Sequence, residues 1–286
     1  MNSIFKCVAK TIIIVFIGGF VGATLVRFAP GYGVSEEELD SRLSGDSLRA
    51  LRLSHAPPRD LLSFYLQYGG KALHGDLGYS NAMREPVRQL IAERLPETMK
   101  SVGFGLALGW AVGLSLAIIS VTTRSATVDF GMSLVATIAL CTPAAVLALL
   151  CVIAQAPGRL VIAAIIFPKV FQYARNLLLR SAALPHVLAA TARGLHGARI
   201  FVWHILPVAV PQLLAVAGVT VSTAFAAAIP VEALCDMPGI GQLAWKAALA
   251  RDLELLVVLT MIVTTATILA NSVAELLGKA ATPRTT

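Results

Sequence analysis

Long apolar runs, separated by shorter polar segments, make up most of the chain. A helix needs about 20 predominantly apolar residues to cross the hydrocarbon core of a bilayer. Six runs of about this length occur with few charges inside them. They are Val8–Ala29, Thr98–Val121, Phe130–Ala154, Leu160–Leu179, Leu206–Leu234 and Leu255–Leu277. Because runs of this length match membrane-spanning helices, the pattern predicts an all-α polytopic membrane protein.

The first and fourth runs carry conflicting signals. Lys6 and Lys10 precede or open the first run, as in a secretory signal peptide. That run is long for such a signal and lacks a clear A-x-A cleavage site, so we predict an uncleaved helix over residues 1–29. Pro168, Lys169 and Arg175 interrupt the fourth run. We still predict a span there.

The basic residues of the short loops predict the orientation, because Lys and Arg resist translocation whereas acids hardly count. With six spans, both termini lie on one side of the membrane. The basic residues on that side are Lys6, Lys10, Arg124, Arg175, Arg180, Arg193, Arg199, Lys279 and Arg284. We therefore expect cytoplasmic termini, an extracytoplasmic segment over 30–96 and a transmembrane domain over 97–286.

Composition supports this interpretation and narrows the function classes. The chain is 57% hydrophobic and 14% charged, with a mean hydropathy of +0.77. The charge asymmetry across the membrane accounts for the net charge of +7, so we infer no nucleic-acid partner. The four cysteines form no C-x-x-C pair, so no disulfide or metal framework is predicted.

Signals for catalysis and metal binding are weak. Gly45–Leu48 spells the nucleophile block of one hydrolase class, in which a nearby base must activate the serine. That base is usually a histidine late in the chain, and no histidine lies beyond His204. A membrane-embedded hydrolase built on Ser47 is therefore a distant alternative. His186, His196 and His204 are ten and eight residues apart and do not share one helical turn. No G-x-x-x-x-G-K-[ST] loop occurs, so we expect no ATP hydrolysis by this chain itself.

Glycines recur every four residues in the second span. Gly105, Gly109 and Gly113 would form a flat strip on which another helix can approach closely. Gly18 and Gly22 repeat the spacing in the first span. For that pair, close packing and the general frequency of glycine in membrane helices are equally good explanations.

A basic stretch, Ala190–Pro207, lies between the fourth and fifth runs. Its pattern predicts short amphipathic helices that are broken near Gly194 and Gly197. Pro207 suits the first turn of the next helix, where its missing N–H costs nothing. We expect a cytoplasmic loop over about 180–206 that meets the fifth span at a fixed angle.

This stretch resembles the cytoplasmic signature of the inner-membrane permease subunits of ABC importers, E-A-A-x-x-x-G-x9-I-x-L-P. Two positions depart from it, because Leu188 replaces the glutamate and His204 replaces an apolar residue. The matching residues are Ala189, Ala190, Gly194, Leu206 and Pro207.

Further motifs place the resemblance in the dipeptide/oligopeptide branch of that family, over nearly the whole chain. The branch shows an apolar-P-G turn, G-D-[LF]-G-x-S, E-R-L-P-x-T, V-E-x-x-F-x-x-P-G-x-G and N-R-D or A-R-D. No aromatic residue stands at the aromatic position of the fourth motif, and the connection Gln155–Arg159 is shorter than usual. The matching segments are Phe28–Gly31, Gly75–Ser80, Glu93–Thr98, Val231–Gly241 and Ala250–Asp252.

Glu232 stands out in the fourth of these motifs. An acid near a bilayer face is costly and is usually paired or open to a cavity, which makes it a candidate functional residue. The alternative is an interface residue that accepts hydrogen bonds from the backbone of the turn at Pro238, Gly239 and Gly241.

The resemblance implies a type I ABC importer permease fold in the cell inner (plasma) membrane, and an ATP-driven importer of dipeptides or oligopeptides. It implies four kinds of partner: a second, similar permease, two ATPase subunits, an extracytoplasmic solute-binding protein and membrane lipid. The loop with Ala189, Ala190 and Gly194 would dock in a groove of an ATPase. Only the partners would use ATP, and this chain would bind no cofactor or metal and carry no catalytic residue.

The topology also allows one other class of protein and, for the importer, predicts a docking surface. Six spans and a glycine strip also fit a secondary transporter or channel that needs no ATPase, although such a protein has no use for the docking loop. For the importer, topology places binding-protein docking on segment 30–96 together with the turn at Pro238 and Gly239.

Overall fold

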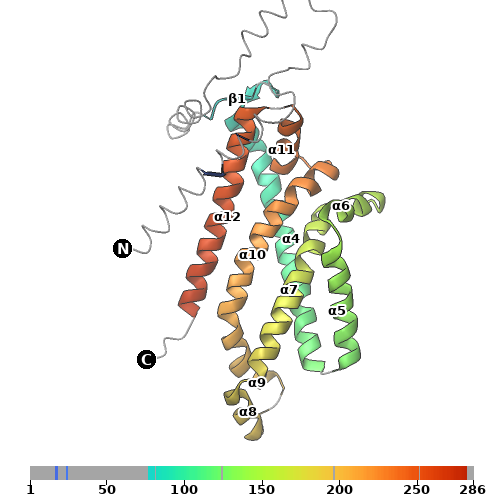
Figure 1. Cartoon of the computed structure of the whole chain (residues 1–286), viewed down its shortest axis with the longest axis vertical. Coiled ribbons are helices and arrows are strands. Elements are labelled where there is room, and N and C mark those ends of the chain that lie inside the picture. Colours follow the sequence, from blue (N-terminus) through green and yellow to red (C-terminus); the bar gives the residue numbers. More distant parts are fainter. Residues whose placement is uncertain are drawn as a thin grey trace, which may run out of the picture.

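The computed structural model describes residues 17, 18, 24, 77–80, 82–123, 125–195, 197–250 and 252–281. These residues form an elongated helical bundle with a small hairpin at one end (Figure 1). The predicted first span, Val8–Ala29, and residues 30–76 lie almost wholly outside the described residues.

The bundle contains one short hairpin and a series of helices. Strands β1 and β2 pair antiparallel, with Tyr79 opposite Pro86 and Ser80 opposite Glu85. The elements are β1 (Tyr79–Ser80), β2 (Glu85–Pro86), α4 (Val87–Thr123), α5 (Ala126–Cys141), α6 (Ala144–Ile153), α7 (Arg159–Ala182), α8 (Pro185–Ala192), α9 (Ala198–Ile200), a π-helical turn η2 (Phe201–Ile205), α10 (Leu206–Leu234), α11 (Ile240–Leu249) and α12 (Leu253–Ala281).

Within the described residues, four helical segments are long and apolar enough to cross a membrane. They are Val87–Thr123, Arg159–Ala182, Ala198–Leu234 and Glu254–Gly278. The interrupted fourth run is therefore one helix, α7, in spite of Pro168. A fifth span exists if α5 and α6 are counted together.

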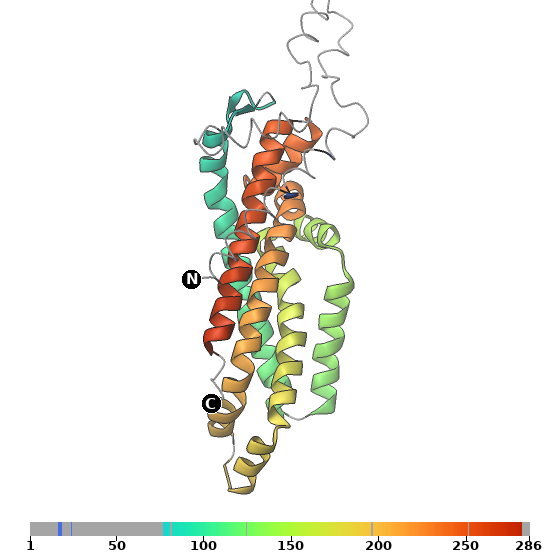
Figure 2. The same cartoon turned by 60° about the vertical axis from the view of Figure 1, so that its left-hand side comes forward.

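The prediction of one continuous helix over Phe130–Ala154 is wrong, because this run forms two helices, α5 and α6. The chain bends by 99° between α5 and α6 (Figure 2). Thr142 has an extended backbone and Pro143 precedes α6. A proline has no N–H to donate, and its ring disfavours helical geometry in the preceding residue. The uniform hydrophobicity of the run conceals this break.

Helix α4 begins at Val87, well before the predicted start of the second span at Thr98. Its first turns therefore belong to residues 30–96, the segment predicted to be extracytoplasmic. As a result, the E-R-L-P-E-T motif lies on a helix and Pro96 lies inside it.

The glycine strip of α4 packs directly against α7. A Cβ atom added at Gly105, Gly109 or Gly113 would lie 2.5 to 2.8 Å from atoms of α7, contributed by Ile162, Ile166 and Phe167. Real Cβ atoms do not come this close, so the two backbones approach at a distance that only glycine allows. The close packing expected from the four-residue spacing is present, and its partner is α7.

Helices α10 and α12 form a second close pair. A Cβ atom at Gly218 would lie 2.9 Å from both Ala274 and Asn271 of α12. Asn271 also donates a hydrogen bond of 2.8 Å to the hydroxyl of Ser222. Polar contacts of this kind join helices where the surroundings are apolar.

One apolar cluster joins four long helices to the segment that follows α7. We call it the junction cluster. It contains buried side chains from α4, α5, α7, α8, η2 and α10, which are Ala117, Ala136, Phe171, Ala174, Leu178, Val187, Ile205, Ala209 and Leu213.

The connections separate to the two ends of the bundle. Helices α8 and α9 lie at one end, and the hairpin and α11 lie at the other (Figure 1). We refer to these as the α8 end and the α11 end.

Candidate functional site

At the α8 end, the predicted break at Gly194 is a helix-ending turn with a defined hydrogen-bond pattern. The N–H of Gly194 donates to the carbonyl of Thr191 at 3.0 Å, and the N–H of Leu195 donates to the carbonyl of Ala190 at 3.2 Å. These two bonds are those of a Schellman motif, which places its C′ residue in the left-handed region. Gly194 occupies that position with φ of +85°.

Gly194 is needed for its backbone conformation and not for space inside the chain. A Cβ atom added there would meet nothing within 4 Å, and the same is true of Gly197, whose φ is +64°. Two glycines with positive φ thus separate α8 from α9.

The signature residues of α8 divide between the interior and the surface. Ala190 is buried, whereas Ala189 and Leu188 are exposed, Leu188 to 59%. Val187, between Leu188 and the start of the helix, belongs to the junction cluster. The inner side of α8 therefore anchors it to the bundle, and the outer side presents an apolar edge that contains the departure at Leu188.

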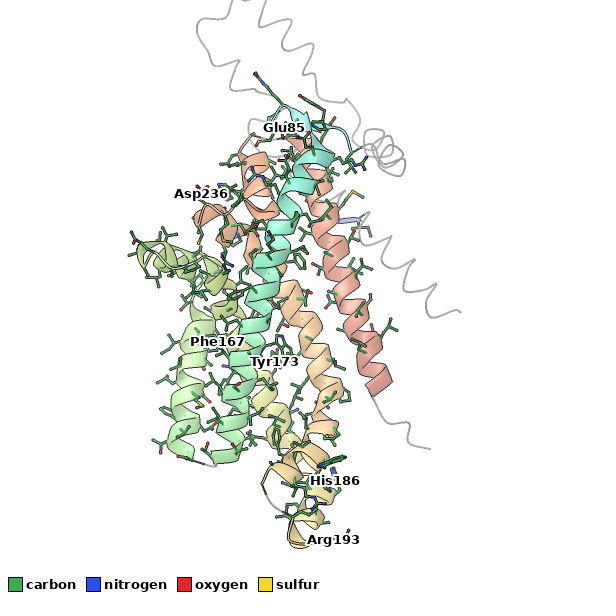
Figure 3. All side chains as sticks on the ribbon, turned by 180° about the vertical axis from the view of Figure 1, so that it is seen from behind. Glu85, Phe167, Tyr173, His186, Arg193 and Asp236 are labelled. Carbon is green, nitrogen blue, oxygen red and sulfur yellow. The ribbon has the colours of Figure 1, made fainter. Side chains whose placement is uncertain are left out.

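Histidines contribute to the same end. Nε2 of His186 lies 3.3 Å from the backbone carbonyl oxygen of His204 and donates to it in the Nε2–H tautomer. His204 lies in η2, directly before Leu206 and Pro207, which form the first turn of α10. Its Nδ1 is buried and has no hydrogen-bond partner in the part of the chain that the structure describes. Figure 3 labels His186 and Arg193 at this end.

At the α11 end, Glu232 is fully buried and fully hydrogen-bonded. It has 0% exposure. Its Oε2 accepts bonds from the hydroxyl of Thr98 at 3.1 Å and the N–H of Gly241 at 2.7 Å, and its Oε1 accepts one from Ser101 at 3.1 Å. This carboxylate joins α4, α10 and α11. A backbone N–H of the turn is thus one of its donors, as in the alternative considered for Glu232 from the sequence.

Both glycines of the P-G-x-G turn are required by this arrangement. A Cβ atom at Gly239 would lie 2.1 Å from Oε2 of Glu232, and one at Gly241 would lie 2.6 Å from Cα of Ile229. The N–H of Ile240 donates to the hydroxyl of Thr98 at 2.7 Å. The first N–H groups of α11 therefore point to this cluster, where a helix N-terminus favours negative charge.

A second carboxylate, Asp252, holds the hairpin to α12. Its Oδ2 accepts bonds from the hydroxyl of Ser80 at 2.7 Å and the N–H of Ala82 at 3.2 Å. Its Oδ1 accepts a bond from the N–H of Leu255 at 3.1 Å. Asp252 is therefore the N-cap of α12 and also the anchor of the hairpin.

The two carboxylates connect four of the motifs found in the sequence. Glu232 connects Glu93–Thr98 to Val231–Gly241, and Asp252 connects Gly75–Ser80 to Ala250–Asp252. Sequence reasoning selected Glu232, Gly239 and Gly241 but missed Thr98, Ser101, Ser80 and Asp252. Three of these four, Thr98, Ser80 and Asp252, are the last residues of their motifs. Their place in a motif was the signal that could have identified them.

A further charged cluster lies towards the α8 end. Arg175 of α7 and Asp129 of α5 form a two-pronged ion pair, and the hydroxyl of Ser120 of α4 also donates to Asp129. The sequence placed Arg175 on the cytoplasmic side but did not indicate that Asp129 is its partner. The pairing satisfies both charges within the bundle.

A bundle of apolar helices with a glycine-packed core, ordered turns at both ends and a short helical segment between two spans is typical of a polytopic membrane transport protein. Residues 102–286 match the family described as "Binding-protein-dependent transport system inner membrane component". The chain belongs to this family, whose members are permease components of ABC importers.

Relatives match along most of the chain. A di/tripeptide transport system permease protein of Pseudomonas aeruginosa is 27% identical, covering 93% of this chain and 94% of that protein. A putative peptide permease protein of Brucella suis is 26% identical, covering 89% of this chain and 86% of that protein.

Solved structures confirm the fold. Two inward-facing structures of the MetNI methionine ABC transporter match with TM-scores of 0.57 and 0.60 at 20% and 18% identity. In both cases the match covers 70% of this chain and 99% of the other chain. The chain has the type I ABC importer permease fold that its motifs imply.

Proposed function

We propose that this chain is one of two permease subunits of an ATP-driven importer of dipeptides or oligopeptides. The cargo class is supported by the relatives, which carry peptide permease names and match over most of their length. Two ATPase subunits and an extracytoplasmic binding protein would complete the complex, and all ATP would be used by the partners.

The observation that carries the ATPase-docking role is the ordered α8 segment. Its apolar outer edge, Leu188 and Ala189, is exposed, while Val187 ties the helix to the junction cluster. The turn at Gly194 ends the helix abruptly. A short helix that is exposed on one side and anchored on the other is suited to fit a groove of an ATPase and to transmit its closure.

Coupling requires that the ATPase and the cargo both bias one two-state element. That element would be the packing of the spans in inward- and outward-facing states. The permease would provide the two arrangements of the spans, and ATP would provide the energy that shifts one to the other. In this arrangement the α8 end is cytoplasmic, together with both termini, and the α11 end faces outward.

The outward end would receive the binding protein. It combines the hairpin with the Pro238–Gly241 turn, and hydrogen bonds that Asp252 and Glu232 accept hold both in place. A surface that must recognise a partner is best built on such fixed turns.

The test is purification of the complex followed by reconstitution. The detergent-solubilised chain should recover an ATPase and a second permease, and liposomes containing the complex should take up a labelled tripeptide only with ATP and the binding protein. Uptake by this chain alone, without ATPase, would instead favour the secondary transporter.

A further inference from the structure

Lys169 places a positive charge near the middle of a membrane-spanning helix. It is ten residues from Arg159 at one end of α7 and thirteen from Ala182 at the other. At about 1.5 Å per residue, these intervals are about 15 and 20 Å. A hydrocarbon core of about 30 Å therefore places Lys169 near its centre.

The described residues provide no acid for Lys169. Its Nζ donates a hydrogen bond of 3.2 Å to the hydroxyl of Thr223 in α10, which is neutral. It makes no ion pair with any residue that the structure describes, whereas Arg175, six residues further along α7, is paired with Asp129. An ammonium group has three N–H donors, so two remain available after the bond to Thr223.

A lysine at this depth is costly if it faces lipid. Lysines near helix ends can extend their charge to the interface, but this position is remote from both ends. Charged residues deep in a membrane protein face the bundle interior or a water-filled cavity, and they often mark the path of a substrate. The absence of an acid within reach favours the cavity.

The neighbourhood of Lys169 along α7 is also polar. Gln172, Tyr173 and Asn176 follow at helical spacings of three, four and seven residues. Gln172 donates to the hydroxyl of Thr137 in α5 at 3.3 Å, and Tyr173 is 54% exposed. Figure 3 shows Tyr173 in the middle of the bundle, far from Glu85 and Arg193 at its ends. Polar groups thus continue from Lys169 towards both α5 and α10.

We propose that Lys169 lines the transport pathway and binds an anionic group of the cargo, namely the C-terminal carboxylate of a peptide. Thr223 positions the ammonium group, and the two free N–H donors face the carboxylate. This inference rests on the proposed function, because it assumes that a peptide passes α7.

The experiment compares a peptide that has the carboxylate with one that lacks it. Reconstituted complexes would import labelled trialanine and its C-terminal amide, each supplied by the same binding protein. We measure the ratio of kcat/KM for the acid to that for the amide. Any preference of the binding protein is the same for every permease variant, so it cancels when variants are compared. We expect Lys169→Met to lower this ratio about tenfold and Lys169→Arg to change it less than about twofold.

Thr223→Val provides a second variant that keeps the charge. It removes only the hydroxyl that positions the ammonium, so the ratio should fall in the same direction by a smaller factor, about threefold. It also keeps the inference testable if Lys169→Met does not assemble.

Two outcomes would overturn the inference. One is an unchanged ratio in Lys169→Met with ATP-dependent uptake intact. The other is loss of the second permease from the Lys169→Met complex with an unchanged ratio in Thr223→Val, because the lysine would then pair with that subunit. Failure of the unaltered complex to import either peptide would count against the proposed function instead.

Discussion

The hydroxyl of Ser80 lies 2.7 Å from a carboxylate oxygen of Asp252, a residue 172 positions further along the chain. The bond closes the α11 end of the bundle, because it fixes the hairpin before α4 to the first turn of α12. The N–H of Tyr79 adds a second link by donating to Glu254 at 3.3 Å. The hairpin is therefore held by α12, although it precedes α4 in sequence.

Replacing Asp252 should destabilise the protein through two losses. Asp252→Ala removes an N-cap, which costs about 1 kcal/mol, and leaves the buried hydroxyl of Ser80 without its acceptor, at about 1 to 3 kcal/mol. Ser80→Ala should cost about 1 kcal/mol, because Asp252 keeps its other donors. The measurement is the thermal unfolding midpoint in detergent.

Glu97 provides the control for Asp252. It pairs with Lys100 on the exposed surface of the same end, so Glu97→Ala should change stability by less than about 0.5 kcal/mol. Equal midpoints for the Asp252 and Glu97 variants would contradict the anchoring role.

Removal of the Glu232 carboxylate should be among the most destabilising single changes at the α11 end. Glu232→Ala leaves the hydroxyl of Thr98 and the N–H of Gly241 without an acceptor in a buried site, while Ser101 keeps the backbone carbonyl of Thr98, and the loss should cost about 3 kcal/mol or more. Glu232→Gln keeps one acceptor oxygen and should cost roughly half as much. Unfolding in detergent measures both.

A double-mutant cycle separates the Glu232 contact from general damage. Thr98→Val and Glu232→Gln should show a coupling energy of about 1 kcal/mol, since their side chains contact each other directly. A coupling energy near zero would mean that the two side chains act independently.

The effect of a glycine substitution in α4 on stability should depend on whether the position faces α7 and not on helix propensity. Gly109→Ala would place its Cβ 2.8 Å from Ile166, and the resulting overpacking should cost about 1 to 3 kcal/mol. Gly103→Ala, in the same helix, meets nothing within 4 Å and should be neutral or stabilising. If unfolding shows equal effects for the two, close packing of α4 on α7 is disproved.

Gly194 should be required for coupling and not for insertion in the membrane. Gly194→Val disfavours the φ of +85° and should reduce peptide-stimulated ATP hydrolysis at least about tenfold. Gly194→Asn should retain most of the activity, because asparagine tolerates the left-handed region. The measurement is ATPase activity of the reconstituted complex with and without loaded binding protein.

Gly131→Val is the matched control for Gly194. Gly131 also has open space around it but has an ordinary helical backbone. Normal coupling in Gly194→Val would refute the docking role. Loss of coupling in Gly131→Val would show that the added side-chain volume, and not the backbone conformation, reduces the ATPase activity.

The positions of the long helices followed from the sequence, whereas their partners did not. Apolar runs locate α7, α10 and α12 because each must bury its backbone in lipid or protein. The same signal hid the bend at Pro143, since local proline geometry overrode a uniformly apolar run. The spacing of Gly105, Gly109 and Gly113 indicates a contact surface, but a four-residue period carries no information about which helix fills it.

In the candidate site too, the sequence predicts local features but not contacts between distant segments. The left-handed turn at Gly194 is local, so the sequence predicts it. Gly241 lies only 9 positions from Glu232, within one motif, whereas the donors Thr98 and Ser101 lie 134 and 131 positions away. Such long-range pairs depend on how the helices assemble, which no local pattern encodes.

The junction cluster has a mechanical consequence. Val187 of α8 lies in the same close-packed group as side chains of α4, α5, α7 and α10, and close-packed interiors transmit strain because they resist compression. In the proposed docking role, a push on α8 would pass through this cluster to all four long helices. A lever that pivots on one helix would tilt that helix alone, whereas this arrangement would displace the whole set together.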